Sequence, residues 1–217
     1  MKRAFDVVIS GLALVILAPF LAVLALAVKL GSAGPCLYRG SRVGWHGKNF
    51  SIIKLRTMVS NADRMAGGSC TASDDQRITR IGRSLRRYKL DEIPQLFNVL
   101  RGDMSLVGPR PEVQEFVDLF TQDEREILTV RPGITDWATL WNADEESLLA
   151  GKTDPEQSYL KEIRPGKLRL QLKYVHERSF SQDLSILLQT SRIVVSRLLG
   201  GRRGPMSNLR KSTRHPQ

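Results

Sequence analysis

The feature that most constrains this chain is an uncharged apolar stretch near its N-terminus. Residues 7–28 are 22 consecutive positions without a charged side chain. A helix needs about 20 apolar residues to cross a hydrocarbon core about 30 Å thick, so this stretch has membrane length. A cleaved signal peptide is an alternative, but its apolar part usually has only about 7–15 residues. We therefore predict a helix embedded in a membrane.

The charges that flank this stretch predict how the helix is oriented. Lys2 and Arg3 precede it, and further positive side chains follow it from Lys29 onward. Because positive charge is retained on the cytoplasmic side, both ends should be cytoplasmic, which a simple spanning helix does not allow. Pro19 divides the stretch into two arms, since a proline inside a helix removes a backbone donor and bends the helix. We predict a re-entrant membrane helix over residues 1–30, each arm matching about one leaflet.

Overall composition limits the partners and the number of domains. The 217 residues suffice for one domain with a core plus a membrane segment, and we assign this domain to residues 31–199. Lysine and arginine number 33 against 22 acidic residues, a net charge of +11 that favours nucleic acid, phosphorylated substrates or acidic lipid headgroups as partners. Cys36 and Cys70 are too few for a disulfide framework and are expected to be reduced thiols in a cytosolic setting. Residues 200–217 are rich in arginine and are expected to form a basic disordered tail.

Between these ends, hydrophobic periodicity predicts an α+β domain that is mostly helical. Residues 36–43 and 49–57 form a small β-hairpin pattern around a turn at 44–47. A basic amphipathic helix is predicted near residues 77–88, and another amphipathic helix near 184–199. A nucleic-acid helix would look similar to the first, but in a chain already in the membrane these helices are expected to lie at the lipid interface. A longer acidic helix is predicted over residues 111–129.

An adjacent carboxylate pair, Asp91 and Glu92, lies just behind a cationic run that includes Arg86 and Lys89. Pro94 suits the first turn of a helix, so both acids should lie at a helix start. The helix dipole and the cations there favour an ionised carboxylate, so at least one acid should be charged at neutral pH. The alternative is that an acid in this place only caps the helix, because Asp is a common cap.

Several arginine and lysine side chains near this pair could bind phosphate. Arg110 lies in the stiff turn Gly-Pro-Arg-Pro, and a guanidinium is well shaped for bidentate phosphate recognition. Strand alternation places Lys54 and Arg56 on one face, either as a cationic wall for a diphosphate or as an ordinary solvated face. Arg131 is held in a second turn, Arg-Pro-Gly. Carboxylates, arginines and rigid turns together indicate phosphate chemistry.

Three ordered motifs in this chain resemble the bacterial sugar transferase family. They are KLRTM at residues 54–58, KLDEIPQLFNVLRGDMSLVGPRPE at 89–112 and RPGIT at 131–135, and the likeness extends over about residues 1–199. These are small monotopic phosphoglycosyl transferases, which move a sugar phosphate from a nucleotide sugar to a polyprenyl phosphate. This chain has Asp136 where relatives often have glycine.

The resemblance implies a two-step reaction on the cytoplasmic face of the bacterial inner membrane. Asp91 would attack the sugar-bearing phosphate of a UDP-sugar, UMP would leave, and undecaprenyl phosphate would then accept the phosphosugar. Glu92 would assist with protons or hold the nucleophile, and Mg²⁺, touched by Asp91, would offset the diphosphate charge. The side chains implied in phosphate contacts are Lys54, Arg56, Arg86, Arg110 and Arg131. Membrane lipids are further expected partners, a homodimer is compatible with the resemblance, and no nucleic acid partner is expected.

Two other classes of function remain open at this point. A nucleotide-sugar glycosyltransferase would pass on the sugar without its phosphate and would release UDP. A basic membrane-bound interaction protein would need the positive helix and tail but not Asp91, and it would release neither nucleotide. The identity of the leaving group therefore separates the three hypotheses.

Overall fold

The structure is a computed structural model, which describes residues 1–62, 65, 68, 70–142 and 144–199. The predicted tail at 200–217 lies outside the described residues. The α-helices are α1 (Lys2–Gly31), α2 (Arg80–Arg87), α3 (Gln95–Arg101), α4 (Gln114–Val117), α5 (Trp137–Trp141), α6 (Glu145–Leu149), α7 (Pro155–Ser158), α8 (Arg164–Glu177) and α9 (Phe180–Leu198). The strands are β1 (Leu37–Val43), β2 (Asn49–Leu55), β3 (Ser105–Val107) and β4 (Gly133–Thr135). Shorter helical turns span Trp45–Gly47, Leu90–Glu92, Glu124–Thr129 and Tyr159–Ile163.

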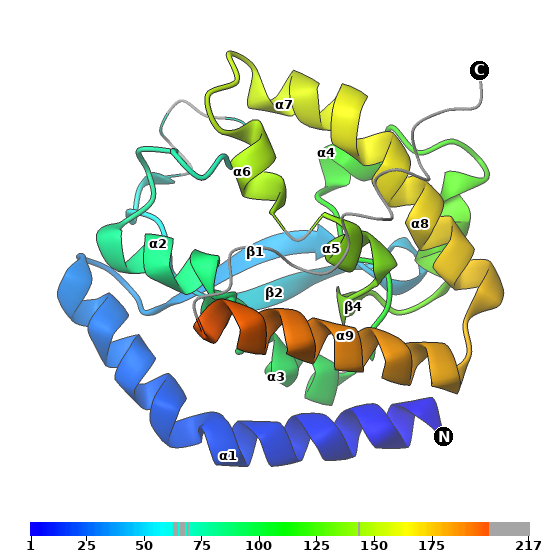
Figure 1. Cartoon of the computed structure of the whole chain (residues 1–217), viewed down its shortest axis with the longest axis horizontal. Coiled ribbons are helices and arrows are strands. Elements are labelled where there is room, and N and C mark those ends of the chain that lie inside the picture. Colours follow the sequence, from blue (N-terminus) through cyan, green and yellow to red (C-terminus); the bar gives the residue numbers. More distant parts are fainter. Residues whose placement is uncertain (63–64, 66–67, 69, 143, 200–217) are drawn as a thin grey trace.

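The N-terminal apolar stretch forms one bent helix, α1, with Pro19 in its interior. Figure 1 shows its two arms meeting at an angle along the lower edge of the molecule, as expected where a proline interrupts the hydrogen-bond ladder. Within the described residues it is the one helix long and apolar enough to cross a membrane, and only 11% of its most apolar window is buried. The bend is confirmed, and the re-entrant path through a bilayer stays a prediction.

A few polar side chains fix the first arm of α1 to the rest of the domain. The buried Asp6 carboxylate accepts hydrogen bonds from the Ser105 hydroxyl at 2.8 Å and the Leu106 amide at 3.3 Å. Arg3 donates to the carbonyls of Val99 and Leu100, at 2.6 and 3.0 Å, in the last turn of α3. The last carbonyls of a helix lack partners within it, so a cation there is favourable twice, as donor and as charge.

The predicted hairpin is confirmed as the antiparallel pair β1–β2, with Gly40 opposite Ile52. Helix α3 packs on it through Asn98, whose Oδ1 accepts from the Ile53 amide at 2.9 Å and whose Nδ2 donates to the Ser51 carbonyl at 2.8 Å. Asn98 is fully buried, so these bonds satisfy a polar group that would otherwise destabilise the core.

A second small sheet was not predicted. Strands β3 and β4 pair in parallel, with Ser105 opposite Gly133. The backbone around Gly133 approaches Gly108 so closely that a Cβ atom on Gly133 would lie 2.1 Å from the Gly108 nitrogen. Only glycine permits this approach, which fixes the segment that follows β3 against β4.

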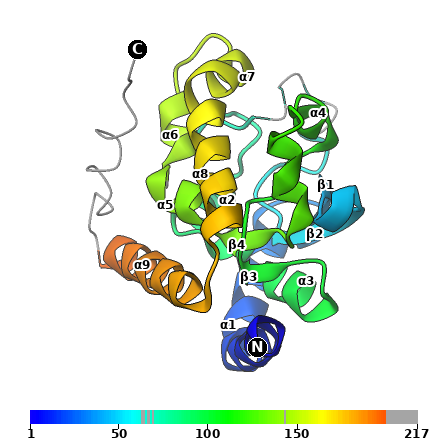
Figure 2. The same ribbon diagram turned by 90° about the vertical axis from the view of Figure 1, so that its right-hand side faces the viewer.

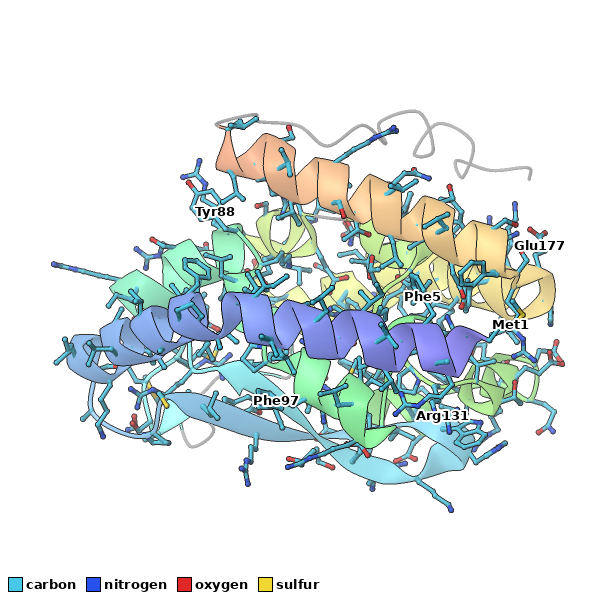
Figure 3. All side chains as sticks on the ribbon, turned by 90° about the horizontal axis from the view of Figure 1, so that it is seen from below. Met1, Phe5, Tyr88, Phe97, Arg131 and Glu177 are labelled. Carbon is cyan, nitrogen blue, oxygen red and sulfur yellow. The ribbon has the colours of Figure 1, made fainter. Side chains whose placement is uncertain are left out.

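Helix α9 packs against both strands of this small sheet, and α8 reaches it through Tyr174, whose hydroxyl contacts the Val107 carbonyl (Figures 1 and 2). Seen from below, α9 runs alongside the first arm of α1 (Figure 3). The two helices meet at their N-terminal ends, where the rings of Phe5 and Phe180 pack edge to face at 5.3 Å. Both helices expose large apolar side chains, for example Val8 (64% exposed), Val15 (74%), Leu188 (53%) and Leu198 (56%).

The predicted α+β class is confirmed: most elements are helices and the hairpin is small. The acidic helix predicted over residues 111–129 is wrong as one continuous element. The chain instead forms the short α4 and a separate turn at Glu124–Thr129, although Phe116, Phe120 and Ile127 are buried as that pattern required. The same apolar side chains can be buried by two short helical segments as well as by one long helix. Periodicity alone does not distinguish the two cases.

Candidate active site

A sharp turn after α2 directs the acid pair into the protein. Lys89 has a φ of 57°, in the left-handed region that costs a side chain with a Cβ atom about 1–3 kcal/mol. The next residues form the turn Leu90–Glu92, in which Asp91 and Glu92 are buried, with 6% and 8% exposure. Helix α3 then begins after Pro94 with no side-chain cap, so neither acid caps it. The helix-cap interpretation of the pair is therefore excluded for α3.

Glu92 is held by two cations from separate parts of the chain. Lys54, near the end of β2, donates to Oε1 at 3.0 Å. Arg110 donates from Nη1 to Oε2 at 3.0 Å and from Nη2 to Oε1, so its guanidinium grips both oxygens. Burial alone would raise the pKa of Glu92, but Arg110 and Lys54 outweigh burial and hold that pKa well below its ordinary value. Glu92 is therefore ionised at neutral pH.

Asp91 has the opposite electrostatic character. Its Oδ1 is buried and has no hydrogen-bond partner within the part of the chain that the structure describes. Burial first, and the charge of Glu92 second, raise the pKa of Asp91, while Lys54, Lys89 and Arg86 act against the rise. Two neighbouring carboxylates thus have pKa values driven in opposite directions, a pattern found where acids have distinct chemical roles.

Arg86 and Lys89 are two further cations near the acid pair, and both contact the Glu146 carboxylate on α6. Arg86 Nε donates to Glu146 at 3.1 Å, and the ammonium of Lys89 lies 3.9 Å from the same carboxylate. Arg86 also reaches the Thr57 hydroxyl at 3.4 Å. Both cations contribute to the field at Asp91, so the structure brings Lys54, Arg86 and Arg110 together around the acid pair.

Arg56 lies elsewhere. It is buried, with 5% exposure, and its guanidinium donates to the carbonyls of Val28, Ser32 and Ala33 where α1 ends. Strand β2 ends at Leu55, so the alternation that placed Arg56 beside Lys54 does not continue to it. The prediction of a phosphate contact by Arg56 finds no support in this placement.

Arg131 likewise contacts other parts of the fold and not the acid pair. Its guanidinium stacks on the Trp45 ring, 4.1 Å from the ring centroid, and its Nε donates to the Gly102 carbonyl at 3.0 Å. A cation over a tryptophan face is a favourable pair, which ties the hairpin turn to the end of α3. These contacts occupy the guanidinium away from the acid pair, so a phosphate contact by Arg131 is likewise unsupported.

The sequence patterns did not reveal several buried polar residues behind the site. Glu112 forms a cluster with Lys167, at 2.5 Å, and with the Tyr159 hydroxyl, at 2.8 Å. Asp136 and Gln171, both fully buried, contact the backbone of Arg110. Nothing in the local sequence around Asp136 indicated these contacts. The spacing of the polar side chains on one face of α8 was the available signal.

Comparison with known proteins shows the family of this chain. Residues 1–197 match the family model described as "Bacterial sugar transferase". The chain belongs to the bacterial sugar transferase family. All three sequence motifs lie within the residues that match this family model.

Curated relatives of this sugar transferase carry related names. The chain is 44% identical over 149 residues to an undecaprenyl-phosphate glucose phosphotransferase of Komagataeibacter xylinus, covering 64% of this chain and 27% of that protein. It is 40% identical over 192 residues to a UDP-glucose:undecaprenyl-phosphate glucose-1-phosphate transferase of Caulobacter vibrioides, covering 87% and 67%. It is 38% identical over 216 residues to the exopolysaccharide production protein PSS of Rhizobium leguminosarum bv. phaseoli, covering 93% and 97%. The matched part is thus about a quarter of the first relative's length and nearly all of the third's.

In this family member, the three motifs contribute differently to the site. The first supplies the Lys54 ammonium, and the second supplies both acids and Arg110. The third supplies backbone: the Pro132 carbonyl accepts from the Ser105 amide at 2.8 Å, and the Thr135 carbonyl accepts from the Gly108 amide at 3.0 Å. The RPGIT segment therefore supports the turn that carries Arg110.

Proposed function

We propose that this sugar transferase transfers a sugar 1-phosphate from a UDP-sugar to a polyprenyl phosphate, with Asp91 as the nucleophile. One observation carries the proposal: a buried carboxylate oxygen without a hydrogen-bond partner among the described residues lies in a site surrounded by Lys54, Arg86 and Arg110. An anionic substrate would be attracted by these cations, and the unpaired oxygen is free to attack. The names of the relatives support the class of substrate.

The proposed reaction has two displacements. In the first, an oxygen of the Asp91 carboxylate bonds to the sugar-bearing phosphorus of the UDP-sugar, and the bond from that phosphorus to the bridging oxygen breaks, releasing UMP. In the second, a phosphate oxygen of the polyprenyl phosphate bonds to the same phosphorus, and the bond to Asp91 breaks, restoring the carboxylate. Splitting one difficult displacement into two easier ones is the usual advantage of a covalent intermediate.

The two acids are suited to different parts of this reaction. Asp91 has to be ionised to attack. Burial and the charge of Glu92 raise its pKa, and the nearby cations limit that rise. Glu92 is held ionised by Arg110 and Lys54, so it has no proton to give as a general acid near neutral pH. We propose that Glu92 orients Lys54 and Arg110 for the phosphates and supports the nucleophile.

A magnesium ion fits the residues that are present, with Asp91 as its protein ligand. Both oxygens of Glu92 are engaged by cations, so Asp91 is the acid of the pair that can also contribute a carboxylate oxygen to the ion. The described residues include no group of three or more His, Cys, Asp or Glu side chains that could hold a metal. Mg²⁺ commonly binds through one or two carboxylates plus substrate phosphates and water, which this single ligand permits. When bound, the ion would offset the charge of the diphosphate.

We propose that the protein works at the cytoplasmic face of the bacterial inner membrane, with α1 re-entrant. The exposed apolar side chains of α1 and α9 support contact with lipid, and the positive charge flanking both ends of α1 supports a cytoplasmic location. A lipid-linked acceptor is insoluble in water, so an enzyme that uses it needs a site close to the bilayer.

The decisive experiment identifies the nucleotide released by purified protein. With a panel of UDP-sugars, Mg²⁺ and radiolabelled undecaprenyl phosphate, we expect UMP as the leaving group. Asp91→Asn should abolish UMP release even without acceptor, because an amide cannot form the acyl phosphate. Mass spectrometry of the wild-type protein after incubation with UDP-sugar alone should detect a phosphosugar on the peptide that contains Asp91.

Other outcomes would contradict the proposal in distinct ways. Release of UDP would indicate a glycosyltransferase, and release of neither nucleotide would indicate a binding protein. An adduct on Glu92, or full activity of the Asp91→Asn protein, would overturn the choice of nucleophile while leaving the overall reaction intact.

A further inference from the structure

We infer that Gln171, together with Asp136, is a positioning residue that fixes the main chain of Arg110 and thereby aims its guanidinium at Glu92. This inference rests on the proposed function for its effect on catalysis. The placement itself rests on buried hydrogen bonds between α8, α5 and the turn that follows β3.

Helix α8 presents three buried polar side chains along one face, at helical spacings of four and three residues. Lys167 contacts the Glu112 carboxylate, Gln171 contacts the Arg110 carbonyl at 3.4 Å, and the Tyr174 hydroxyl lies 3.2 Å from the Val107 carbonyl. As α8 proceeds, the segment it contacts runs backwards from residue 112 to 107. Helix α8 thus contacts the segment that carries Arg110 at three points.

Backbone bonds to β4 hold the turn at Gly108 and Pro109, and the hydrogen bonds of Arg110 itself hold its centre. Pro109 and Pro111 have no amide hydrogen, so the Arg110 amide is the only backbone donor from 109 to 111. That amide donates to Oδ2 of Asp136 at 3.3 Å. The same Oδ2 accepts from Nε2 of Gln171 at 3.1 Å, and Oδ1 of Asp136 accepts from the Thr139 amide at 2.6 Å at the start of α5.

Gln171 therefore closes a small ring of hydrogen bonds. Its single amide nitrogen has two hydrogens, one directed to Asp136 and one to the Arg110 carbonyl. Both Asp136 and Gln171 have 0% exposure, so bulk water does not compete for these bonds. Both bonds lead to the main chain of Arg110, directly or through Asp136. Gln171 can therefore influence the acid pair through the placement of Arg110.

The position of the Arg110 main chain affects catalysis because the guanidinium of Arg110 binds both oxygens of Glu92. A bidentate grip on Glu92 requires the guanidinium plane to match the carboxylate plane. A displacement of the backbone by about 1 Å would spoil this match without removing any group from the site. Such misplacement affects rate more than binding, because it acts on the geometry of the reacting groups.

The test compares Gln171→Met with a matched control, Gln189→Met. Gln189 lies on α9, and its side chain donates to the Ser185 hydroxyl on the same helix, at 3.1 Å. Gln171→Met keeps the side-chain length and removes the donor. We expect it to lower kcat for UMP release by about tenfold or more, with a much smaller change in KM for the UDP-sugar, while Gln189→Met leaves both unchanged.

A double-mutant cycle separates positioning from general destabilisation. In an Arg110→Lys background, followed by single-turnover detection of labelled UMP, Gln171→Met should change the rate by less than about twofold, because no guanidinium remains to be aimed. A loss that is as large in this background as in the wild type would overturn the inference. Thermal unfolding of each variant shows whether the fold itself has been damaged.

A readout without turnover keeps this inference independent of the proposed function. Hydrogen exchange at the Arg110 amide should be faster in Gln171→Met than in the wild type, and unchanged in Gln189→Met. Unchanged exchange in Gln171→Met would overturn the inference even if UMP is released as proposed. Faster exchange in a protein whose wild type releases no UMP would leave the placement supported and would contradict the proposed function alone.

Discussion

Arg56 and Ser32 are joined by two hydrogen bonds, one from the guanidinium Nη2 to the Ser32 carbonyl at 2.7 Å and one to its hydroxyl at 3.0 Å. The two residues are 24 positions apart, and the contact joins the end of β2 to the end of α1. A helix leaves its last carbonyls without partners, and here one buried arginine from another segment satisfies carbonyls at the helix end.

Arg56→Ala should therefore act on stability. Hydrogen bonds to a charged group are worth about 1.5–3 kcal/mol, so we expect the free energy of unfolding to fall by about 2 kcal/mol or more. Thermal unfolding in detergent measures this, with the exposed Arg39→Ala as the control that removes a similar charge. UMP release per folded molecule should be retained. If the variant has normal stability but no longer releases UMP, Arg56 instead acts in the substrate site.

The pH dependence of activity should report the electrostatic link between the two acids. The charge of Glu92 raises the pKa of Asp91, and Glu92 also engages Lys54 and Arg110. Glu92→Gln removes the repulsion and releases both cations, and each change lowers the pKa of Asp91. We expect the acidic limb of the kcat/KM profile to move to lower pH in this variant, whose rate should be lower overall. A limb that moves to higher pH, or does not move, would show that Asp91 is not the group titrating there.

Glu112 should contribute stability that disappears in acid. Burial alone would raise the pKa of Glu112, but Lys167 and Tyr159 hold it below the ordinary value of 4.5. A carboxyl with a depressed pKa in the folded state contributes stability that is fully present above its unfolded pKa and is lost as the pH falls through the folded pKa. The free energy of unfolding should thus decrease below about pH 4.5. The decrease should be smaller in Glu112→Gln and unaltered in the exposed Glu177→Gln, as measured by denaturant titration at several pH values.

The path of α1 through the membrane can be tested by labelling. In a background without Cys36 and Cys70, one cysteine is added directly N-terminal to Met1 and another replaces Arg39, so that the pair flanks the helix. The re-entrant prediction requires an impermeant maleimide to reach both positions from the same side of sealed vesicles. Labelling from opposite sides would show a simple spanning helix and would leave the placement of the acid pair unaffected.

Local patterns predicted the elements whose side chains repeat with a clear period. The apolar run of α1, its proline bend and the alternation of β1 and β2 are each set by neighbouring residues, and all three are present. The β3–β4 pair escaped prediction because each strand has three residues, too few to show alternation, and the pairing depends on the close approach at Gly133.

The candidate site was predictable only in part, for a similar reason. Lys54, Arg86 and Arg110 lie at the acid pair, while Arg56 and Arg131 were expected there and bind backbone carbonyls instead. An arginine that holds a phosphate and one that closes a helix end can have similar neighbours in sequence. What separates them is the direction of the side chain, which depends on where a strand ends and which distant carbonyls lack partners.

Lys2 has a consequence for the height of the site above the lipid. Its ammonium donates to the Val107 carbonyl at 3.0 Å and to the Asp183 carboxylate at 2.6 Å, and the Tyr174 hydroxyl contacts the same carbonyl and the same carboxylate. The first turn of the apolar helix is thereby joined to the strand that leads into the Arg110 turn. If the bilayer sets the depth of α1, it also sets the vertical distance between the headgroup layer and Asp91. Because that distance would be fixed, the site would favour acceptors whose phosphate lies at the lipid surface over phosphates free in solution.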